Sequence, residues 1–261
     1  MNDLLGSQLG ELPAFRALLR AVEARFYADL PLPAPTLDLG CGDGHFASVT
    51  FDRPLDAGFD PWRGPLIEAK ERGAHLSLAL AEGAQMPYPD GAFSSVISNS
   101  VLEHIPDLEP VLAEVSRVLV PGGVFYFCVP GPDFLSFLSI GRALDRVGLR
   151  RLAGCYRVFF SRISRHYHCD GVDVWRQRLE TAGLALDRWW PYFSQRATTA
   201  LEWGHYLGLP SVVSKVLTGR WVLSRGRANL WLTDQLLRPL YQEPLPDRGA
   251  YLFFVAHRPE A

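Results

Sequence analysis

The sequence predicts an α/β fold in which seven strands form a mostly parallel sheet with helices on both faces. Short apolar runs alternate with amphipathic helical segments along the 261 residues, as in parallel strands joined by helical crossovers. A bare glycine turn, "TLDLGCGDGHFA" (Thr36 to Ala47), follows the first apolar run. At 48% hydrophobic residues the chain can bury one full core, so we expect a single domain over residues 1–261.

The elements follow in the order that such a sheet requires. Apolar residues at helical spacing in residues 12–30 predict an N-terminal helix before the first strand at 36–40. Later strands are expected at "LDAGFD" (55–60), "LSLALAE" (76–82), "SSVISNS" (94–100), "VFYFCVP" (124–130), "ALDRWWPYF" (185–193) and "AYLFFVAH" (250–257). Further helices are expected at 64–73, 107–119 and 171–184. The "PGG" at 121–123 is expected to stop the helix before the fifth strand.

Two segments, 131–168 and 194–247, fall outside the predicted sheet and are much longer than ordinary connections. Segments of that length in a compact domain tend to be functional covers. The first holds seven arginines against two aspartates, and the second holds six basic against four acidic residues. We therefore expect the two insertions to form a basic, helical substrate cover on an acidic sheet domain.

Charge and cysteine content exclude several classes of protein. A net charge of −2 gives no polycationic field, which argues against a nucleic-acid partner. The four scattered cysteines predict reduced thiols in the cytoplasm, and the start of the chain lacks the basic and apolar pattern of a signal peptide. "HYHC" (166–169) suggests a metal, but no second group of ligands follows along the sequence, so we expect no metal site.

The glycine turn indicates a ligand. A strand, a glycine turn and a helix N-terminus allow backbone N–H groups to approach a ligand closely. The spacing Gly40, Gly42, Gly44 departs from G-x-G-x-x-G, because His45 stands where the third glycine would be, and this disfavours a nicotinamide cofactor. Asp60, at the end of the second strand, can accept both hydroxyls of a ribose. The turn thus favours a nucleoside, although an ordinary tight connection remains an alternative.

Further motifs carry a family resemblance. With "LDLGCGDG", "GFDPW" and the run from "AEGAQMPYPDG" through "SNSVLEHIPD" to "VLVPGG", the chain resembles the class I S-adenosylmethionine-dependent methyltransferases that act on small molecules and lipids. The resemblance is close over Leu37 to Pro130 and looser to the last strand. It implies a Rossmann-like fold, S-adenosylmethionine as cofactor, and a small-molecule or lipid-like methyl acceptor.

The resemblance also implies which residues bind the cofactor. They are Asp38, Gly40, Cys41 and Gly42 at the methionine and ribose, Asp60 at the ribose hydroxyls, Pro61 and Trp62 beside the adenine, Glu82, Gly83, Ala84, Gln85 and Met86 at the adenine amino edge, and Asn99 and Ser100 at the ammonium group. Glu82 stands where the family usually has aspartate, which leaves its direct role open.

His104, in "VLEHIP", is the candidate catalytic residue. It follows the fourth strand, where the family's acceptor groups lie, and an imidazole suits proton removal from a hydroxyl or amine. Methyl transfer from a sulfonium depends mainly on positioning, so no larger catalytic set is required. The alternatives are a loop-shaping histidine and, for the whole chain, a non-catalytic S-adenosylmethionine-binding protein or a nucleotide-dependent oxidoreductase.

The insertions suggest the kind of acceptor. They interleave the arginines Arg142, Arg146, Arg150 and Arg151 with the aromatic residues Phe134, Phe137, Tyr156, Phe159, Phe160, Trp203, Tyr206, Trp221, Trp231 and Tyr241. This combination predicts an amphipathic, negatively charged acceptor and peripheral contact with an anionic membrane. The alternative is a helical subdomain whose aromatics form its own core. The oligomeric state is left open.

Overall fold

The computed structural model describes residues 3–219, 221–222 and 227–260. Residues 220 and 223–226 of the second predicted insertion therefore lie outside the described residues. The chain divides into two compact units. The sheet unit comprises Leu30–Pro132, Ser161–Trp190 and Tyr251–Ala261, and the helical unit comprises Met1–Asp29, Asp133–Phe160 and Pro191–Ala250.

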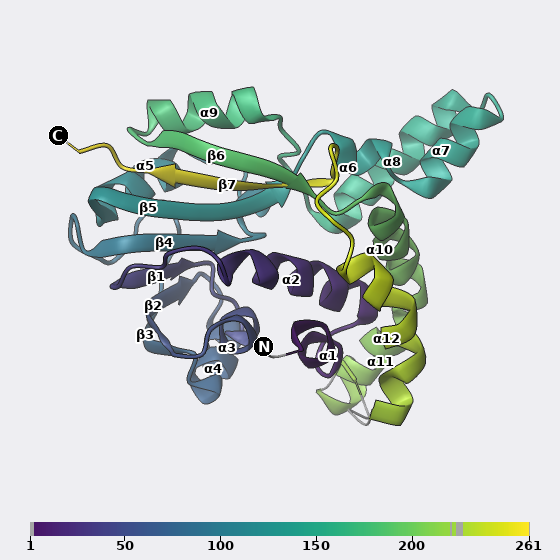
Figure 1. Cartoon of the computed structure of the whole chain (residues 1–261), viewed down its shortest axis with the longest axis horizontal. Helices are drawn as coiled ribbons and strands as arrows, with labels where there is room; N and C mark the ends of the chain where they lie inside the picture. The colour runs from purple at the N-terminus through teal and green to yellow at the C-terminus, as the bar shows by residue number, and fades with distance from the viewer. Residues whose placement is uncertain (1–2, 220, 223–226, 261) are drawn as a thin grey trace. The chain divides into compact units, whose positions relative to one another are not determined.

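The sheet unit contains one seven-stranded sheet with the strand order β3-β2-β1-β4-β5-β7-β6 (Figure 1). The strands are β1 (Thr36–Leu39), β2 (Leu55–Asp60), β3 (His75–Leu80), β4 (Phe93–Asn99), β5 (Leu119–Pro130), β6 (Ala185–Tyr192) and β7 (Tyr251–His257). The pairs among β1 to β5 are parallel, whereas β7 runs antiparallel to β5. This arrangement confirms the predicted Rossmann-like, mostly parallel fold.

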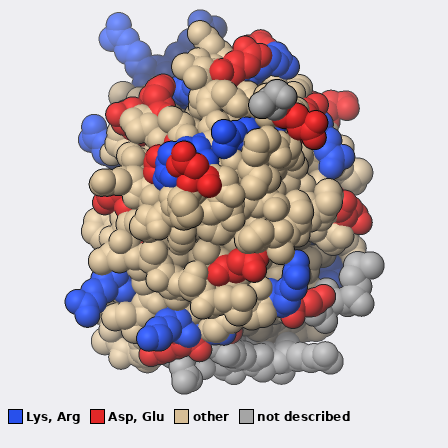
Figure 2. All heavy atoms as spheres, turned by 90° about the vertical axis from the view of Figure 1, so that its left-hand side faces the viewer, with Lys and Arg blue, Asp and Glu red and all other residues tan. Residues whose placement is uncertain are grey.

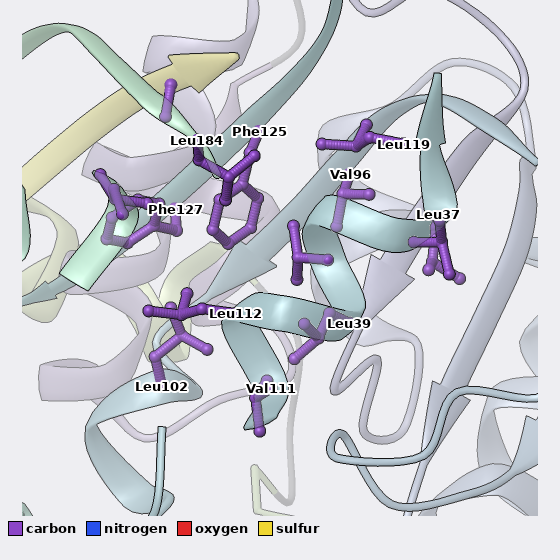
Figure 3. Packing of buried hydrophobic residues seen from close by; sticks show 14 of the residues in the cluster. Leu37, Leu39, Val96, Leu102, Val111, Leu112, Leu119, Phe125, Phe127 and Leu184 are labelled. Atoms are coloured by element: carbon purple, nitrogen blue, oxygen red, sulfur yellow. The ribbon is translucent and has the colours of Figure 1, made fainter. Parts of the chain in front are cut away.

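Helices α5 (Glu109–Val118) and α9 (Val172–Thr181) cover the inward-facing residues of the central strands. The apolar stripe of α5, which includes Val111 and Leu112, packs into the same buried cluster as Phe125 and Phe127 of β5 (Figure 3). Burying one large apolar side chain contributes about 1.5–3 kcal/mol, so this cluster holds the strand ends in place. The other helices of this unit are α3 (His45–Thr50), α4 (Arg63–Arg72) and the short 3₁₀ helix η1 (Leu102–His104).

The fifth strand begins earlier than the sequence predicts. Strand β5 starts at Leu119 and includes the "PGG" that was expected to separate it from the preceding helix. Phe93 pairs with Leu119 but Ser95 pairs with Val124, so the extra residues bulge out of the ladder. Gly122 adopts φ +75° and its N–H donates to the carbonyl of Arg258, which fixes the bulge to the segment after β7.

The predicted N-terminal helix is present as α2 (Ala14–Tyr27), but it belongs to the helical unit. There its buried Glu23 accepts hydrogen bonds from the hydroxyl of Tyr192 and the guanidinium of Arg20, each at 2.8 Å. The helical unit also contains α1 (Leu4–Leu9), α6 (Asp133–Ser136), α7 (Ser139–Arg146), α8 (Arg150–Ser164, continuing into the sheet unit), α10 (Gln195–Leu207), α11 (Leu209–Thr218) and α12 (Arg227–Tyr241).

Part of the aromatic content of the insertions packs inside the helical unit. Phe134 and Phe160 are buried, with ring centroids 6.0 Å apart. The buried carboxylate of Glu202 accepts hydrogen bonds from the hydroxyls of Tyr156 at 2.5 Å and Ser139 at 2.6 Å. These contacts tie the two insertions together, whereas Phe159, Trp203 and Trp231 remain exposed.

Two further features of the molecule are the distribution of charged side chains on one face and the apolar length of the helices. On the face that Figure 2 shows, acidic and basic side chains are interspersed among uncharged ones. Among the described helices, none combines the length and apolar character that a membrane span requires.

Candidate cofactor and acceptor site

The candidate site lies at the carboxyl ends of β1, β2 and β4. In the strand order, β1 lies between β2 and β4. From β1 the chain adds β2 and β3 toward one edge of the sheet, and it then returns to add β4 and β5 on the other side of β1. Open α/β sheets bind ligands in the crevice at such a switch point. Asp60 ends β2, Asn99 ends β4, and the glycine turn follows β1 directly. These predicted residues therefore meet at one edge of the sheet.

The glycine turn is held by β2 and leaves one glycine facing open space. The N–H groups of Gly40 and Cys41 both donate to the carbonyl of Phe59 at 3.0 Å. Gly40 has φ +73°, and a β-carbon there would lie 2.5 Å from a methyl group of Val101. Gly42 has φ +54°, but a β-carbon there would meet no atom within 4 Å. Packing thus requires the first glycine, and the second leaves room for a ligand.

Asp60 is oriented by the backbone around it. Its side chain accepts from Gly42 N–H at 3.0 Å through Oδ2 and from Trp62 N–H at 2.9 Å through Oδ1. Burial raises the pKa of Asp60; the two N–H donors oppose that rise, and the carboxylates of Asp38 and Glu82 add to it. A fixed carboxylate beside the open face of Gly42 suits the ribose of a nucleoside, and three converging carboxylates suit a cationic ligand. Both properties fit S-adenosylmethionine.

Asp38 is held by a residue that the sequence analysis missed. His75 Nε2, on β3, lies 2.9 Å from Asp38 Oδ2, and both side chains are buried. The histidine reaches across β2 at Gly58, where a β-carbon would lie 2.7 Å from the imidazole. A glycine inside a strand often marks a close approach of this kind, so Gly58 was the available signal. His75 therefore fixes the orientation of Asp38 below the turn.

The loop after β3 divides into exposed residues and one buried residue. Glu82, Ala84 and Gln85 are exposed, as are Pro61 and Trp62 on the neighbouring loop, with Trp62 at 70%. Met86 is buried in the hydrophobic core. Its N–H donates to Glu114 at 2.6 Å and its carbonyl accepts from Arg117 at 3.1 Å. Met86 thus attaches the loop to α5, and the predicted adenine contact depends on the residues before it.

The end of β4 has an unusual backbone. Ser100 has φ +53°, which costs about 1–3 kcal/mol for a residue other than glycine, and such strain often occurs at functional sites. Its N–H donates to the carbonyl of Cys128 at 3.3 Å, and Asn99 Oδ1 accepts from the thiol of Cys128 at 3.2 Å. This turn directs the following residue, Val101, against Gly40. The residue after the end of β4 therefore packs against the glycine turn that follows β1.

His104 lies on η1, directly after this turn. Its side chain is 43% exposed. His104 Nδ1 lies 3.0 Å from the carbonyl oxygen of Arg165. A carbonyl can only accept, so Nδ1 carries the proton, and in the neutral ring the lone pair is on Nε2. His104 can therefore present a base or a metal ligand to a bound molecule.

The thiol of Cys41 is not a nucleophile in this setting. Burial raises the pKa of Cys41, and the carboxylates of Asp38 and Asp60 raise it further. The thiol stays protonated at neutral pH, and only thiolates react readily. Cys41 thus contributes to the turn by its backbone and its small buried side chain.

Comparisons with known proteins indicate what this chain is similar to. Residues 37–127 match the family model described as "Methyltransferase domain". The chain is 37% identical over 92 residues to malonyl-[acyl-carrier protein] O-methyltransferase of Serratia marcescens, covering 35% of this chain and 36% of that protein. It is 31% identical over 175 residues to trans-aconitate 2-methyltransferase of Methylobacterium nodulans, covering 64% of each. In both cases the match spans less than two thirds of the relative's length.

A solved structure extends the likeness in fold to nearly the whole chain. The S-adenosylmethionine-dependent methyltransferase of Mesorhizobium loti superimposes with a TM-score of 0.54 at 18% sequence identity. The superposition covers 92% of this chain and 98% of that one. At this identity the likeness concerns the fold alone.

Proposed function

We propose that this chain, a member of the class I S-adenosylmethionine-dependent methyltransferases, transfers a methyl group from S-adenosylmethionine to a small-molecule acceptor. The observation that carries the proposal is the fixed carboxylate of Asp60 beside the open face of Gly42. The cofactor supplies an activated methyl group on a positively charged sulfur. The protein then has to hold donor and acceptor in line, which accounts for most of the acceleration in such a displacement.

Most of the predicted cofactor residues have a task in this account. Asp60 accepts the ribose hydroxyls, and the backbone carbonyls at Asn99 and Ser100 accept from the ammonium group. Asp38, oriented by His75, adds negative charge near the amino group. Trp62 and Pro61 flank the adenine on one side, and Glu82 or the backbone of Gly83, Ala84 and Gln85 meets its amino edge. All of these residues belong to the sheet unit.

Transfer itself is tested with labelled cofactor. The protein is incubated with methyl-labelled S-adenosylmethionine and either a lipid extract or an extract of soluble metabolites. We expect label to appear in an acceptor and S-adenosylhomocysteine to form in equal amount. Binding of the cofactor without transfer to either extract would favour the non-catalytic alternative.

His104 is proposed to act on the acceptor. Replacing it with alanine should lower kcat by about 10²–10⁴-fold, the range for loss of a positioned group that assists proton removal. The affinity for S-adenosylmethionine should stay unchanged, because none of the proposed cofactor contacts involves this side chain. Single-turnover rates and calorimetric titrations measure the two effects.

His257→Ala is the matched control, since His257 is also a partly exposed histidine, paired with Asp187 Oδ1 at 2.7 Å. This control should be fully active. If His104→Ala also turns over at the wild-type rate, His104 only shapes the loop.

The acceptor is proposed to be amphipathic and acidic. Helix α8 exposes Leu152 and Phe159. Their spacing of seven residues places them on one stripe of the helix. The exposed Arg151 lies beside this stripe. An apolar stripe with arginine beside it is typical of helices that lie in the interface of an anionic membrane. Both named relatives act on acidic acceptors, malonyl-[acyl-carrier protein] and trans-aconitate, which agrees with a negatively charged substrate.

The membrane contact predicts salt-sensitive sedimentation with vesicles. The protein should co-sediment with phosphatidylglycerol-containing vesicles at low salt and less so at high salt, because salt screens the arginine contacts. Phe159→Glu should abolish co-sedimentation. Leu76→Glu, which changes an exposed leucine on β3, should not affect it. Equal sedimentation of the two variants, or no binding by the wild type, would point to a soluble acceptor.

A further inference from the structure

A second site is formed by residues that are distant in the sequence. Glu103 and His104 of η1 and His166, from the segment after α8, each offer one ligating atom, and these atoms all lie within 4.8 Å of one another. Glu103 is buried, His166 is half-buried and His104 is exposed. All three belong to the sheet unit. Two imidazoles and a carboxylate with one open side form a donor set suited to a divalent transition metal.

Hydrogen bonds join η1 and the residue after it to residues 165–168 around this cluster. Tyr167 N–H donates to the carbonyl of Glu103 at 2.8 Å. His104 Nδ1–H donates to the carbonyl of Arg165, and His168 Nε2 binds the carbonyl of Ile105 at 2.9 Å. Metal-binding histidines usually donate their second ring N–H to a carbonyl or carboxylate, which aims the other nitrogen at the ion. His104 has this arrangement, with Nε2 3.8 Å from Glu103 Oε1.

Arg165, the residue directly before the ligand His166, has a strained backbone. Arg165 has φ +56°, an unfavourable conformation for an arginine. The carbonyl of this residue accepts the proton of His104, and the next residue is His166. The turn therefore serves both histidines: it fixes the ring of the first and brings the second to the cluster.

We propose that Glu103, His104 and His166 bind one divalent transition-metal ion, with zinc preferred. Tetrahedral zinc with bonds of 2.0–2.2 Å separates its ligand atoms by about 3.3 Å. The observed spread of up to 4.8 Å therefore has to close by small side-chain rotations, which the exposed ring of His104 permits. Three protein ligands leave a coordination position open, as in catalytic zinc sites.

The fold brings the further ligands near "HYHC" that the sequence spacing did not show. "HYHC" alone suggested no complete site, because its partners lie about sixty residues earlier, in "VLEH". The structure brings His166, the first histidine of that motif, to Glu103 and His104. The second histidine, His168, instead binds the carbonyl of Ile105 and lies 3.4 Å from Asp170 Oδ2. The expectation of no metal site rested on sequence spacing, which cannot register this pairing.

The consequence for catalysis rests on the proposed function. An acceptor hydroxyl in the open position would have its pKa lowered by the ion, so its proton would leave to water at neutral pH. The resulting oxyanion would take the methyl group from the sulfonium, which becomes a neutral thioether. His104 would then assist the acceptor through the ion and not as a direct base.

Zinc binding is measured on the untagged full chain, stripped with a chelator and titrated with Zn²⁺, Mn²⁺ and Mg²⁺. We expect one zinc per chain, tighter than manganese, and magnesium weakest. His166→Ala should weaken zinc binding by roughly a hundredfold or more, since loss of even an outer-sphere partner costs 10–100-fold. Glu103→Gln should act in the same direction. His257→Ala alters a histidine–carboxylate pair for which the described residues offer no third ligand, and it should bind zinc like the wild type.

Titration of the same samples with S-adenosylmethionine separates the two proposals. Unchanged cofactor binding by His166→Ala shows that the variant is folded and that its zinc defect is local. A wild type that binds the cofactor but no stoichiometric zinc, or a His166→Ala variant that binds zinc normally, overturns the metal site and leaves the proposed function intact. Zinc binding without cofactor binding would overturn the proposed function alone.

Discussion

Replacing Gly42 with valine is expected to abolish the binding of S-adenosylmethionine while the chain stays folded. A β-carbon at this position meets no protein atom within 4 Å, so the side chain would occupy space that the protein leaves open for a ligand. The positive φ of +54° makes valine unfavourable by about 1–2 kcal/mol, a cost that a folded domain can absorb. Calorimetric titration measures binding, and thermal unfolding measures the folding cost.

Gly73→Val is the matched control for this variant. Gly73 caps the end of α4 with φ +67°, and a β-carbon there also meets no atom within 4 Å. The two variants should lose similar stability, but only Gly42→Val should lose the cofactor. If both bind the cofactor like the wild type, the glycine turn does not contact it.

Replacing Asp60 with asparagine is expected to weaken cofactor binding at least tenfold. The carboxylate would accept two ribose hydroxyls, and charge-assisted hydrogen bonds contribute about 1.5–3 kcal/mol each. Asp56→Asn is the control, since it removes another carboxylate of β2 that lies away from the site. Asp56 Oδ2 accepts from Thr36 N–H at the opposite end of the strand. The control should bind normally, and equal affinities for Asp60→Asn and wild type would remove Asp60 from the site.

The same residue predicts a pH dependence of binding. Burial raises the pKa of Asp60 above that of an ordinary aspartate. The ionised form accepts the ribose hydroxyls, so affinity should be complete above the raised pKa and should fall as the pH drops through it. The loss should therefore begin at a higher pH than an exposed aspartate would give. Asp60→Asn should show no such step, which isothermal titrations at several pH values can detect.

The sequence was sufficient for the sheet because its signals are local. The helix from Glu109 to Val118 follows from its apolar periodicity, and Gly40 and Asp60 follow from motif spacing. The "PGG" was misjudged because a bulge can carry a strand through residues that usually end one. Sequence patterns do not register which strand gains extra residues.

Contacts between distant segments were beyond the reach of the sequence. His75 was missed because its pairing with Asp38 depends on the strand order and on the gap at Gly58. His166 was judged without Glu103 and His104, which only the folded loop brings near. The placement of α2 in the helical unit likewise depends on tertiary contacts, such as the one between Glu23 and Tyr192.

Isothermal titration of the wild-type chain with S-adenosylmethionine, S-adenosylhomocysteine and NAD tests the central claim most directly. The account predicts one bound molecule per chain for the first two ligands and no binding of NAD, because His45 occupies the position of the third dinucleotide glycine. Saturable binding of NAD, or no binding of either adenosyl compound, would contradict the assignment of the β1, β2 and β4 strand ends as a methyl-donor site.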